Sequence, residues 1–142
     1  MKFVSATFSA ELRSLKEIQK FLRESARAAD FSALELDRLD LVMEEIAVNV
    51  CRHAYSDAQE RPLRIDCAVE GKGEIMVRVA DRGVPFDPRT APVPNLNAEL
   101  KDRPVGGLGL FVVSHLARVI SYERSDGWNR LSVLFSSSQD ST

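Results

Sequence analysis

The stretch from Leu39 to Tyr55, LDLVMEEIAVNVCRHAY, constrains the fold of this chain more than any other. Residues four apart on a helix lie one above the other, so Glu45, Asn49 and His53 form a polar column. The column runs along the flank of an apolar face made by Leu39, Met43, Ile46, Val50 and Ala54. A carboxylate or an amide buried unpaired at the edge of a core costs roughly a few kcal/mol. These groups are therefore either satisfied locally or face a pocket.

The composition is that of an ordinary globular protein. With 142 residues, 44% of them hydrophobic and 28% charged, the chain is expected to form a single domain over residues 1–142. A net charge of −2 gives no general attraction for nucleic acid or an anionic membrane. No signal peptide or membrane-spanning run is recognisable. Cys51 and Cys67 match no metal or disulfide pattern, so reduced, buried thiols and a cytoplasmic location are expected.

The first half of the chain predicts one strand and two helices. Lys2–Phe8 alternates imperfectly and is typical of a short strand. Apolar residues at helical spacing predict an amphipathic helix from Leu12 to Ala29. Ser32 and Glu35 form a capping-box signature, which predicts a second helix running to about Ala54.

The second half predicts a hairpin, a long irregular segment and a further helix. Strands are expected at Leu63–Glu70 and Glu74–Asp81, joined by a glycine turn, with Asp81 facing the buried side. Five of the six prolines lie between Val84 and Val105, and an irregular segment of this length is usually a functional lid or a disordered loop. A third helix is expected from the glycines at 106–109 to about Ala117, followed by strands at 119–124 and 131–135.

This order of elements predicts an α/β (α+β) fold. We expect a two-layer sandwich with a mixed, mostly antiparallel sheet covered on one face by three helices. Neither a P-loop nor a G-x-G-x-x-G motif after a strand is present, so the two commonest nucleotide signatures are absent.

Three short motifs in this order resemble the N, G1 and G2 boxes of the ATPase fold shared by sensor histidine kinases, gyrase-type ATPases and Hsp90. The closest resemblance is to the anti-sigma-factor serine kinases, the small single-domain branch of this histidine-kinase-like (GHKL, Bergerat) family. This chain matches the branch's E-x-x-x-N-x-x-x-H-x-Y helix with Glu45, Asn49, His53 and Tyr55, and its D-x-G-x-x-F-D-P strand end with Asp81, Gly83 and Phe86–Pro88. It matches the G-L-G-L helix start with Gly107–Leu110 and the closing N-R-hydrophobic strand with Asn129–Leu131.

The resemblance implies a role for each of these positions. Asn49 would ligate Mg²⁺, which takes few protein ligands while bridging phosphates. Glu45 would act as the catalytic base for the attacking hydroxyl. Asp81 would accept a hydrogen bond from the adenine amino group. ATP contacts are implied for Asn49, His53, Asp81, Gly83, Phe86, Arg103, Gly106, Gly107, Leu108, Gly109 and Leu110.

Other readings of the single residues stay open. Glu45 taken alone could be a surface carboxylate paired with Arg38 or Arg52, and His53 a structural histidine. Kinases of this branch often have an arginine just before the glycine box, where this chain has Pro104, Val105 and Gly106. Arg103, Lys101 and Arg89 are the candidates to supply that positive charge from the lid. The absence of this arginine argues against phosphoryl transfer more than against nucleotide binding.

The resemblance implies an ATP- and Mg²⁺-dependent anti-sigma factor with protein serine kinase activity. It would phosphorylate a STAS-type anti-sigma antagonist and sequester a sigma factor or similar regulator. A second copy of the chain is expected as its partner in a homodimer. Neither nucleic acid nor membrane is expected as a direct partner. The alternative is a nucleotide-binding regulatory module without transfer activity. The ATPase half of a sensor histidine kinase is disfavoured, because no helical hairpin with a phosphoaccepting histidine precedes the domain.

Overall fold

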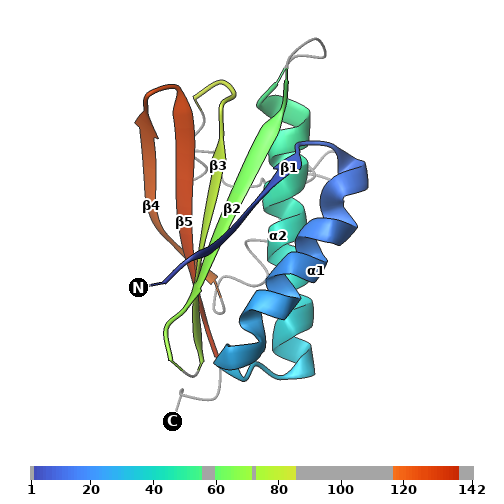
Figure 1. Ribbon diagram of the computed structural model, residues 1–142, viewed down its shortest axis with the longest axis vertical. Helices are drawn as coiled ribbons and strands as arrows, with labels where there is room; N and C mark the ends of the chain where they lie inside the picture. Colours follow the sequence, from blue (N-terminus) through green and yellow to red (C-terminus); the bar gives the residue numbers. More distant parts are fainter. Residues whose placement is uncertain (1, 56–59, 72, 86–116, 138–142) are drawn as a thin grey trace, which may run out of the picture.

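A five-stranded sheet with helices on one of its faces forms the framework of the protein (Figure 1). The computed structural model describes residues 2–55, 60–71, 73–85 and 117–137. The strands lie in the order β1-β2-β3-β5-β4, and each neighbouring pair is antiparallel. They span β1 Val4–Ser9, β2 Pro62–Val69, β3 Glu74–Asp81, β4 Ala117–Ser125 and β5 Trp128–Ser136. The predicted two-layer architecture is confirmed, and within the described strands the sheet is wholly antiparallel.

Alternation of apolar and polar residues determines which way each strand faces. In β3, Ile75, Val77, Val79 and Asp81 are buried on the side of the helices, as the sequence predicts. In β5, Asn129, Leu131, Val133 and Phe135 face the same side. Strand β4 begins at Ala117, two residues before the predicted start, and has a register shift between Val119 and Ser121. The predicted third helix, up to residue 116, lies outside the described residues.

The helical segment after β1 is divided into three parts, where the sequence predicts one helix. A 3₁₀ turn, Leu12–Ser14, precedes α1, Leu15–Ser25, and a second 3₁₀ turn, Ala26–Ala29, follows it. Helix α1 buries Ile18 and Leu22. Asp30 then adopts a left-handed conformation, φ 60°, which ends the segment and turns the chain toward the next helix.

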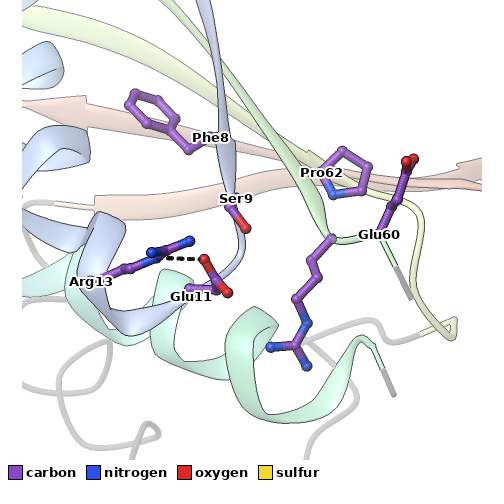
Figure 2. Close-up of a pocket in the computed structure, with 7 residues that line it drawn as sticks. Phe8, Ser9, Glu11, Arg13, Glu60 and Pro62 are labelled. Atoms are coloured by element: carbon purple, nitrogen blue, oxygen red, sulfur yellow. Dashed lines mark hydrogen bonds and ion pairs between the residues drawn. The ribbon is translucent and has the colours of Figure 1, made fainter. Parts of the chain in front are cut away.

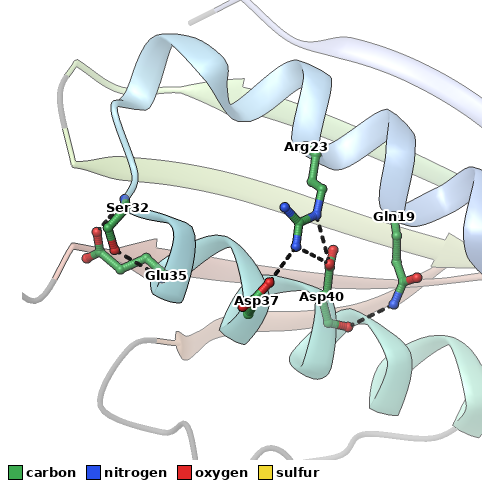
Figure 3. A network of polar contacts seen from close by, with 6 residues as sticks. All are labelled: Gln19, Arg23, Ser32, Glu35, Asp37 and Asp40. Atoms are coloured by element: carbon green, nitrogen blue, oxygen red, sulfur yellow. Dashed lines mark hydrogen bonds and ion pairs between the residues drawn. The ribbon is translucent and has the colours of Figure 1, made fainter.

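Helix α2, Ala33–His53, begins at the predicted capping box (Figure 3). The Ser32 hydroxyl accepts a hydrogen bond from the Glu35 amide at 3.1 Å, and the Ser32 amide donates to the Glu35 carboxylate at 2.8 Å. Arg23 on α1 forms ion pairs with Asp37 and Asp40 of α2, at 2.7 and 2.6 Å. These interactions determine where α2 begins and how it lies beside α1.

The hydrophobic core lies between the sheet and the two helices. Its fully buried side chains come from both layers, among them Leu22, Leu39, Met43, Ile65 and Phe135. Each buried side chain of this size contributes roughly 1.5–3 kcal/mol relative to an exposed one. In the described part of the chain, neither α1 nor α2 combines the length and the apolar character that crossing a membrane requires.

Candidate active site

The C-terminal end of α2 packs directly against the end of β3. Gly83 is buried there, and a Cβ atom at this position would overlap the backbone and the side chain of Ala54. The Val84 amide donates a hydrogen bond to the Ala54 carbonyl at 3.0 Å. Glycine at position 83 is therefore required for the helix to approach the strand end so closely.

Tyr55 joins three elements at this end of the sheet. Its hydroxyl donates to the Pro62 carbonyl at 2.6 Å and accepts from the Arg82 amide at 2.5 Å. Burial raises the pKa of the Tyr55 hydroxyl, with the Arg82 amide acting in the opposite direction. The hydroxyl therefore stays protonated and able to donate at neutral pH. Tyr55 thus fixes the end of α2 relative to the first residue of β2 and the residue that directly follows β3.

Asp81 and Asn129 form a buried polar pair beside this junction. Their relative exposures are only 7% and 5%. One carboxylate oxygen of Asp81 accepts from the Gly83 amide at 2.8 Å and from the Asn129 side-chain amide at 2.9 Å. The Asn129 amide also donates to the Val84 carbonyl at 2.8 Å, and Tyr122 donates its hydroxyl proton to the Asn129 side-chain oxygen. The carboxylate is thereby held in a fixed orientation at the strand end.

Glu45 and Asn49 lie one turn apart on α2, in the half-buried zone between core and solvent. Glu45 Oε2 is buried and has no hydrogen-bond partner in the described part of the protein. Burial, and secondarily Glu44, raises the pKa of Glu45, whereas Arg52 lowers it. Among the described residues, neither Arg38 nor Arg52 forms an ion pair with Glu45. The reading of Glu45 as a paired surface carboxylate is therefore not supported.

The distance of these two groups from the contact with the strand end follows from their positions along α2. A helix rises about 1.5 Å per residue, so Asn49 and Glu45 lie roughly 7.5 and 13.5 Å along the axis from Ala54. Glu44, the adjacent carboxylate, is exposed, as the helix geometry predicts. A buried unsatisfied carboxylate oxygen one turn from a half-buried amide is an arrangement typical of a ligand site.

The donor atoms present fit a magnesium ion that keeps most of its water. Asn49 supplies one oxygen ligand of the hard type that Mg²⁺ prefers. Within residues 2–55, 60–71, 73–85 and 117–137, no group of three or more His, Cys, Asp or Glu side chains could form an all-protein metal cage. Asn49, with its one side-chain oxygen, would be suited to hold Mg²⁺ together with water and phosphate oxygens.

Several of the residues expected to contact the nucleotide lie beyond the described part of the chain. Phe86, Arg103, Lys101, Arg89 and the glycine box from Gly106 to Leu110 lie outside the described residues, as does the side chain of His53. The structure brings together Asp81 and Gly83 from β3 with the end of the helix that carries Glu45 and Asn49.

Sequence reasoning did not assign a site role to Asn129, Tyr122 or Arg124. Asn129 binds Asp81 directly, and the Arg124 guanidinium donates to the Gly83 carbonyl at 2.6 Å. The one available signal was the N-R-hydrophobic pattern at positions 129–131, which marked Asn129 but not its partner. Tyr122 and Arg124 carry no motif and reach the site only because β4 pairs with β5.

A separate cleft of about 510 Å³ opens at the β1–β2 side of the sheet (Figure 2). It is lined by Phe8, Ser9, Glu11, Arg13, Glu60, Arg61 and Pro62. A hydrogen bond from Arg13 to the Glu11 carboxylate, 2.7 Å long, lowers the pKa of Glu11. None of the residues expected to bind nucleotide lines this cleft, so it is distinct from the site on α2 and β3.

Comparison with known proteins identifies the family of the chain. Residues 8–135 match the family model of the histidine kinase-like ATPase domain. A serine/threonine-protein kinase from Bordetella bronchiseptica, BtrW, is 31% identical over 103 residues, covering 72% of each chain. The chain therefore belongs to the histidine kinase-like ATPase family, in its serine kinase branch. The family and enzyme class predicted from the sequence are confirmed.

Solved structures show the same fold at lower sequence identity. The RsbU and RsbW domains of Rv1364c from Mycobacterium tuberculosis give a TM-score of 0.61 at 16% identity, covering 96% of this chain and 32% of that one. The blue-light activated histidine kinase EL346 of Erythrobacter litoralis gives 0.59 at 18% identity, covering 91% and 42%. This chain thus spans about a third and about two fifths of those chains.

Proposed function

We propose that the protein is an ATP- and Mg²⁺-dependent anti-sigma factor with serine kinase activity. It phosphorylates a serine of a STAS-type anti-sigma antagonist and sequesters a sigma factor or a similar regulator. The observation that carries the catalytic part is the unsatisfied Glu45 carboxylate one turn from Asn49, on a helix whose end packs against Asp81 and Gly83. The protein acts in the cytoplasm as a homodimer.

Adenine recognition is assigned to the strand end. Asp81 is buried and its carboxylate is oriented by Gly83 and Asn129, so it can accept a hydrogen bond from an exocyclic amino group in a fixed direction. A buried acceptor discriminates strongly against bases that lack a donor at that point, because the acceptor would be left unpaired. This supports preference for adenine over guanine, which presents a carbonyl at the corresponding position.

Phosphoryl transfer is assigned to α2. Asn49 would hold Mg²⁺ together with phosphate oxygens, and the ion would supply neutralisation of the charge on the phosphates. Glu45 accepts the proton of the serine hydroxyl while the serine oxygen forms a bond to the γ-phosphorus. The bond from the γ-phosphorus to the bridging oxygen breaks, and ADP leaves with that electron pair. General base catalysis of this kind contributes roughly 10²–10⁴-fold. The raised pKa of Glu45 makes it a stronger base than an ordinary glutamate.

The partners are proposed from the proteins to which the chain is similar. A relative that covers 72% of this chain is named a serine/threonine-protein kinase, and a structural neighbour contains a domain named RsbW. Both support a protein, not a small molecule, as the phosphate acceptor. Arg103, Lys101 and Arg89 are the candidates to contact the γ-phosphate.

The test is to compare the wild-type protein with Asn49→Ala for Mg-ATP binding and for phosphoserine formation on a STAS-type protein. We expect Asn49→Ala to lose measurable Mg-ATP affinity by calorimetry while its thermal unfolding remains cooperative. Lys20→Ala, an exposed substitution on α1, is the matched control and should bind ATP normally. Unchanged ATP affinity in Asn49→Ala would overturn the site assignment.

The transfer step is tested separately with Glu45→Gln. This variant should bind Mg-ATP but form phosphoserine about 10²-fold or more slowly than the wild type. If the wild type binds Mg-ATP tightly but transfers no phosphate to a partner that it demonstrably binds, the kinase proposal fails. The protein would then act as a nucleotide-binding regulatory module.

A further inference from the structure

Four arginines that the proposed kinase chemistry does not use lie near one another on the sheet face away from α1 and α2. Arg64, Arg78, Arg82 and Arg130 lie on or directly after the neighbouring strands β2, β3 and β5. In Figure 1 both labelled helices lie on the opposite side of the sheet. We call the surface formed by these four residues the arginine face.

Strand register brings these arginines close to one another. Arg64 pairs with Ala80, which pairs in turn with Arg130 on the next strand. Adjacent strands lie roughly 4.8 Å apart, so the backbones of Arg64 and Arg130 are about 10 Å apart. In the next row Arg78 lies between Asp66 and Ser132. Arg64 and Arg82 are exposed, and Arg78 and Arg130 are partly exposed, whereas Ala80 between them is buried.

Neighbouring groups hold three of the guanidinium groups in place. Arg78 lies 4.6 Å from the centre of the Phe3 ring, and Arg82 lies 5.6 Å from that of Trp128. Arg130 donates to the Ser125 hydroxyl at 2.7 Å. A guanidinium has five N–H donors, so each retains donors for a further acceptor. Because the side chains are already ordered, binding to them costs less conformational entropy.

The charge balance of this face is opposite to that of the whole protein. Asp66 lies between two of the arginines, 3.0 Å from Arg64 and 3.8 Å from Arg78, and its side chain is only 8% exposed. Glu123 pairs with Arg130 across β4 and β5. Around the four arginines, these two carboxylates leave a local excess of two positive charges, whereas the whole chain has a net charge of −2. Farther along the same side, Arg118 of β4 and Glu74 of β3 add one charge of each sign.

We propose that the arginine face is a docking surface for an acidic protein segment, rich in Asp and Glu. Arginine binds carboxylates in a bidentate manner, and the spaced arginines match separate carboxylates better than a continuous phosphate chain. A continuous row of phosphates would meet Asp66 and Glu123 as well as the arginines, whereas separate carboxylates can avoid them, so nucleic acid is disfavoured. A second copy is also disfavoured, because a two-fold contact through this face would bring arginine against arginine. The proposal is independent of the kinase assignment.

The experiment uses the full chain and a short fluorescein-labelled peptide of alternating Glu and Ala. Binding is measured by fluorescence anisotropy at low salt, and the contacted residues are mapped by amide chemical shifts. We expect Arg64→Glu combined with Arg130→Glu to weaken binding by about tenfold or more. Lys16→Glu combined with Lys20→Glu, on the exposed side of α1, makes the same change in net charge and should leave the affinity unchanged.

A single exposed substitution, Arg82→Glu, keeps the test valid if the double variant does not fold. It should weaken peptide binding severalfold, and the peptide should shift amides of β2, β3 and β5 more than those of α1. Equal weakening by the control, shifts confined to α1, or absence of peptide binding would each overturn the proposal. Tighter binding of duplex DNA than of the peptide at the same salt concentration would also overturn it. The same holds if the wild type is a dimer and the Arg82→Glu variant is a monomer.

Discussion

Asp81 is oriented by one near neighbour and one distant residue. The near neighbour, the Gly83 amide two positions away, could be anticipated from the sequence, because aspartate at a strand end often accepts from such an amide. The distant one, Asn129, is 48 positions away and is adjacent only because β5 pairs with β3. The sequence therefore predicts that Asp81 faces the buried side, but not which residue holds its carboxylate.

The raised pKa of Glu45 gives a prediction about pH. If Glu45 is the base, phosphoserine formation should increase as the pH rises through its raised pKa, since only the carboxylate accepts a proton. The same shift opposes stability. A carboxyl whose pKa is higher in the folded state stabilises the fold fully below the ordinary value of 4.5, and this contribution is lost as the pH rises through the raised pKa.

The measurements are pH profiles of transfer rate and of denaturant unfolding for the wild type and Glu45→Gln. The variant should lose the acidic limb of the rate profile and should gain stability relative to the wild type at the higher pH. Glu44→Gln, at the exposed neighbouring position, is the control and should retain the limb. A similar limb in Glu45→Gln would show that another group is titrating.

Substitution of Gly83 should damage both stability and nucleotide binding. The Cβ atom of Gly83→Ala would overlap Ala54 and force the end of α2 away from β3, at a cost of roughly 1–3 kcal/mol. Gly71→Ala is the matched control, because a Cβ there meets no atom within 4 Å and the cost is limited to its φ of +67°. Thermal unfolding and calorimetry should show ATP affinity weakened only in Gly83→Ala, and normal affinity there would contradict the role of this contact.

At the scale of elements, the sequence predicted the start of α2 better than the extent of the helical segment before it. The capping box of α2 is fully specified by Ser32 and Glu35, so its start could be predicted and is confirmed. The segment Leu12–Ala29 has helical spacing throughout, yet 3₁₀ turns flank α1 on both sides. The hydrophobic pattern does not distinguish a 3₁₀ turn from an α-helical one when each is short.

Removal of the cap should destabilise α2. Ser32→Ala deletes the acceptor for the Glu35 amide and should lower the free energy of unfolding by about 1 kcal/mol. Chemical denaturation monitored by circular dichroism measures this directly. Lys20→Ala, on the exposed face of α1, should change stability by less than about 0.5 kcal/mol. A Ser32→Ala variant as stable as the wild type would mean that the Glu35 interaction alone maintains the start of the helix.

At the scale of the whole molecule, the two hairpins could be predicted but the order of strands could not. Short turns indicate that β2 pairs with β3 and β4 with β5, and both pairs are observed. The placement of β5 between β3 and β4 depends on pairing between residues 48 to 62 positions apart, for which the sequence has no local signal. That pairing is also what brings Asn129 to Asp81, so the unpredicted part of the fold and the unpredicted part of the site have the same origin.

Burial of the two cysteines gives a prediction for the intact molecule. Burial raises the pKa of the Cys67 thiol to about 11 and also raises that of Cys51, which is only half-buried. Since the thiolate is the reactive form, Cys67 should react with thiol reagents at about pH 8 at least 10²-fold more slowly than a free thiol. Cys51→Ser isolates Cys67, and rapid labelling of that variant before unfolding would contradict the packing of β2.

Trp128 is the single tryptophan of the chain, and it lies beside Arg82 at the edge of the arginine face. Its backbone immediately precedes Asn129, which points to the other side of the sheet. Its fluorescence is therefore a native probe that reports on the arginine face. A molecule that covers the arginine face should change its emission directly, whereas a ligand at Asp81 should do so only indirectly through the strand. Two binding events on opposite sides of one sheet can thus be told apart without adding any label.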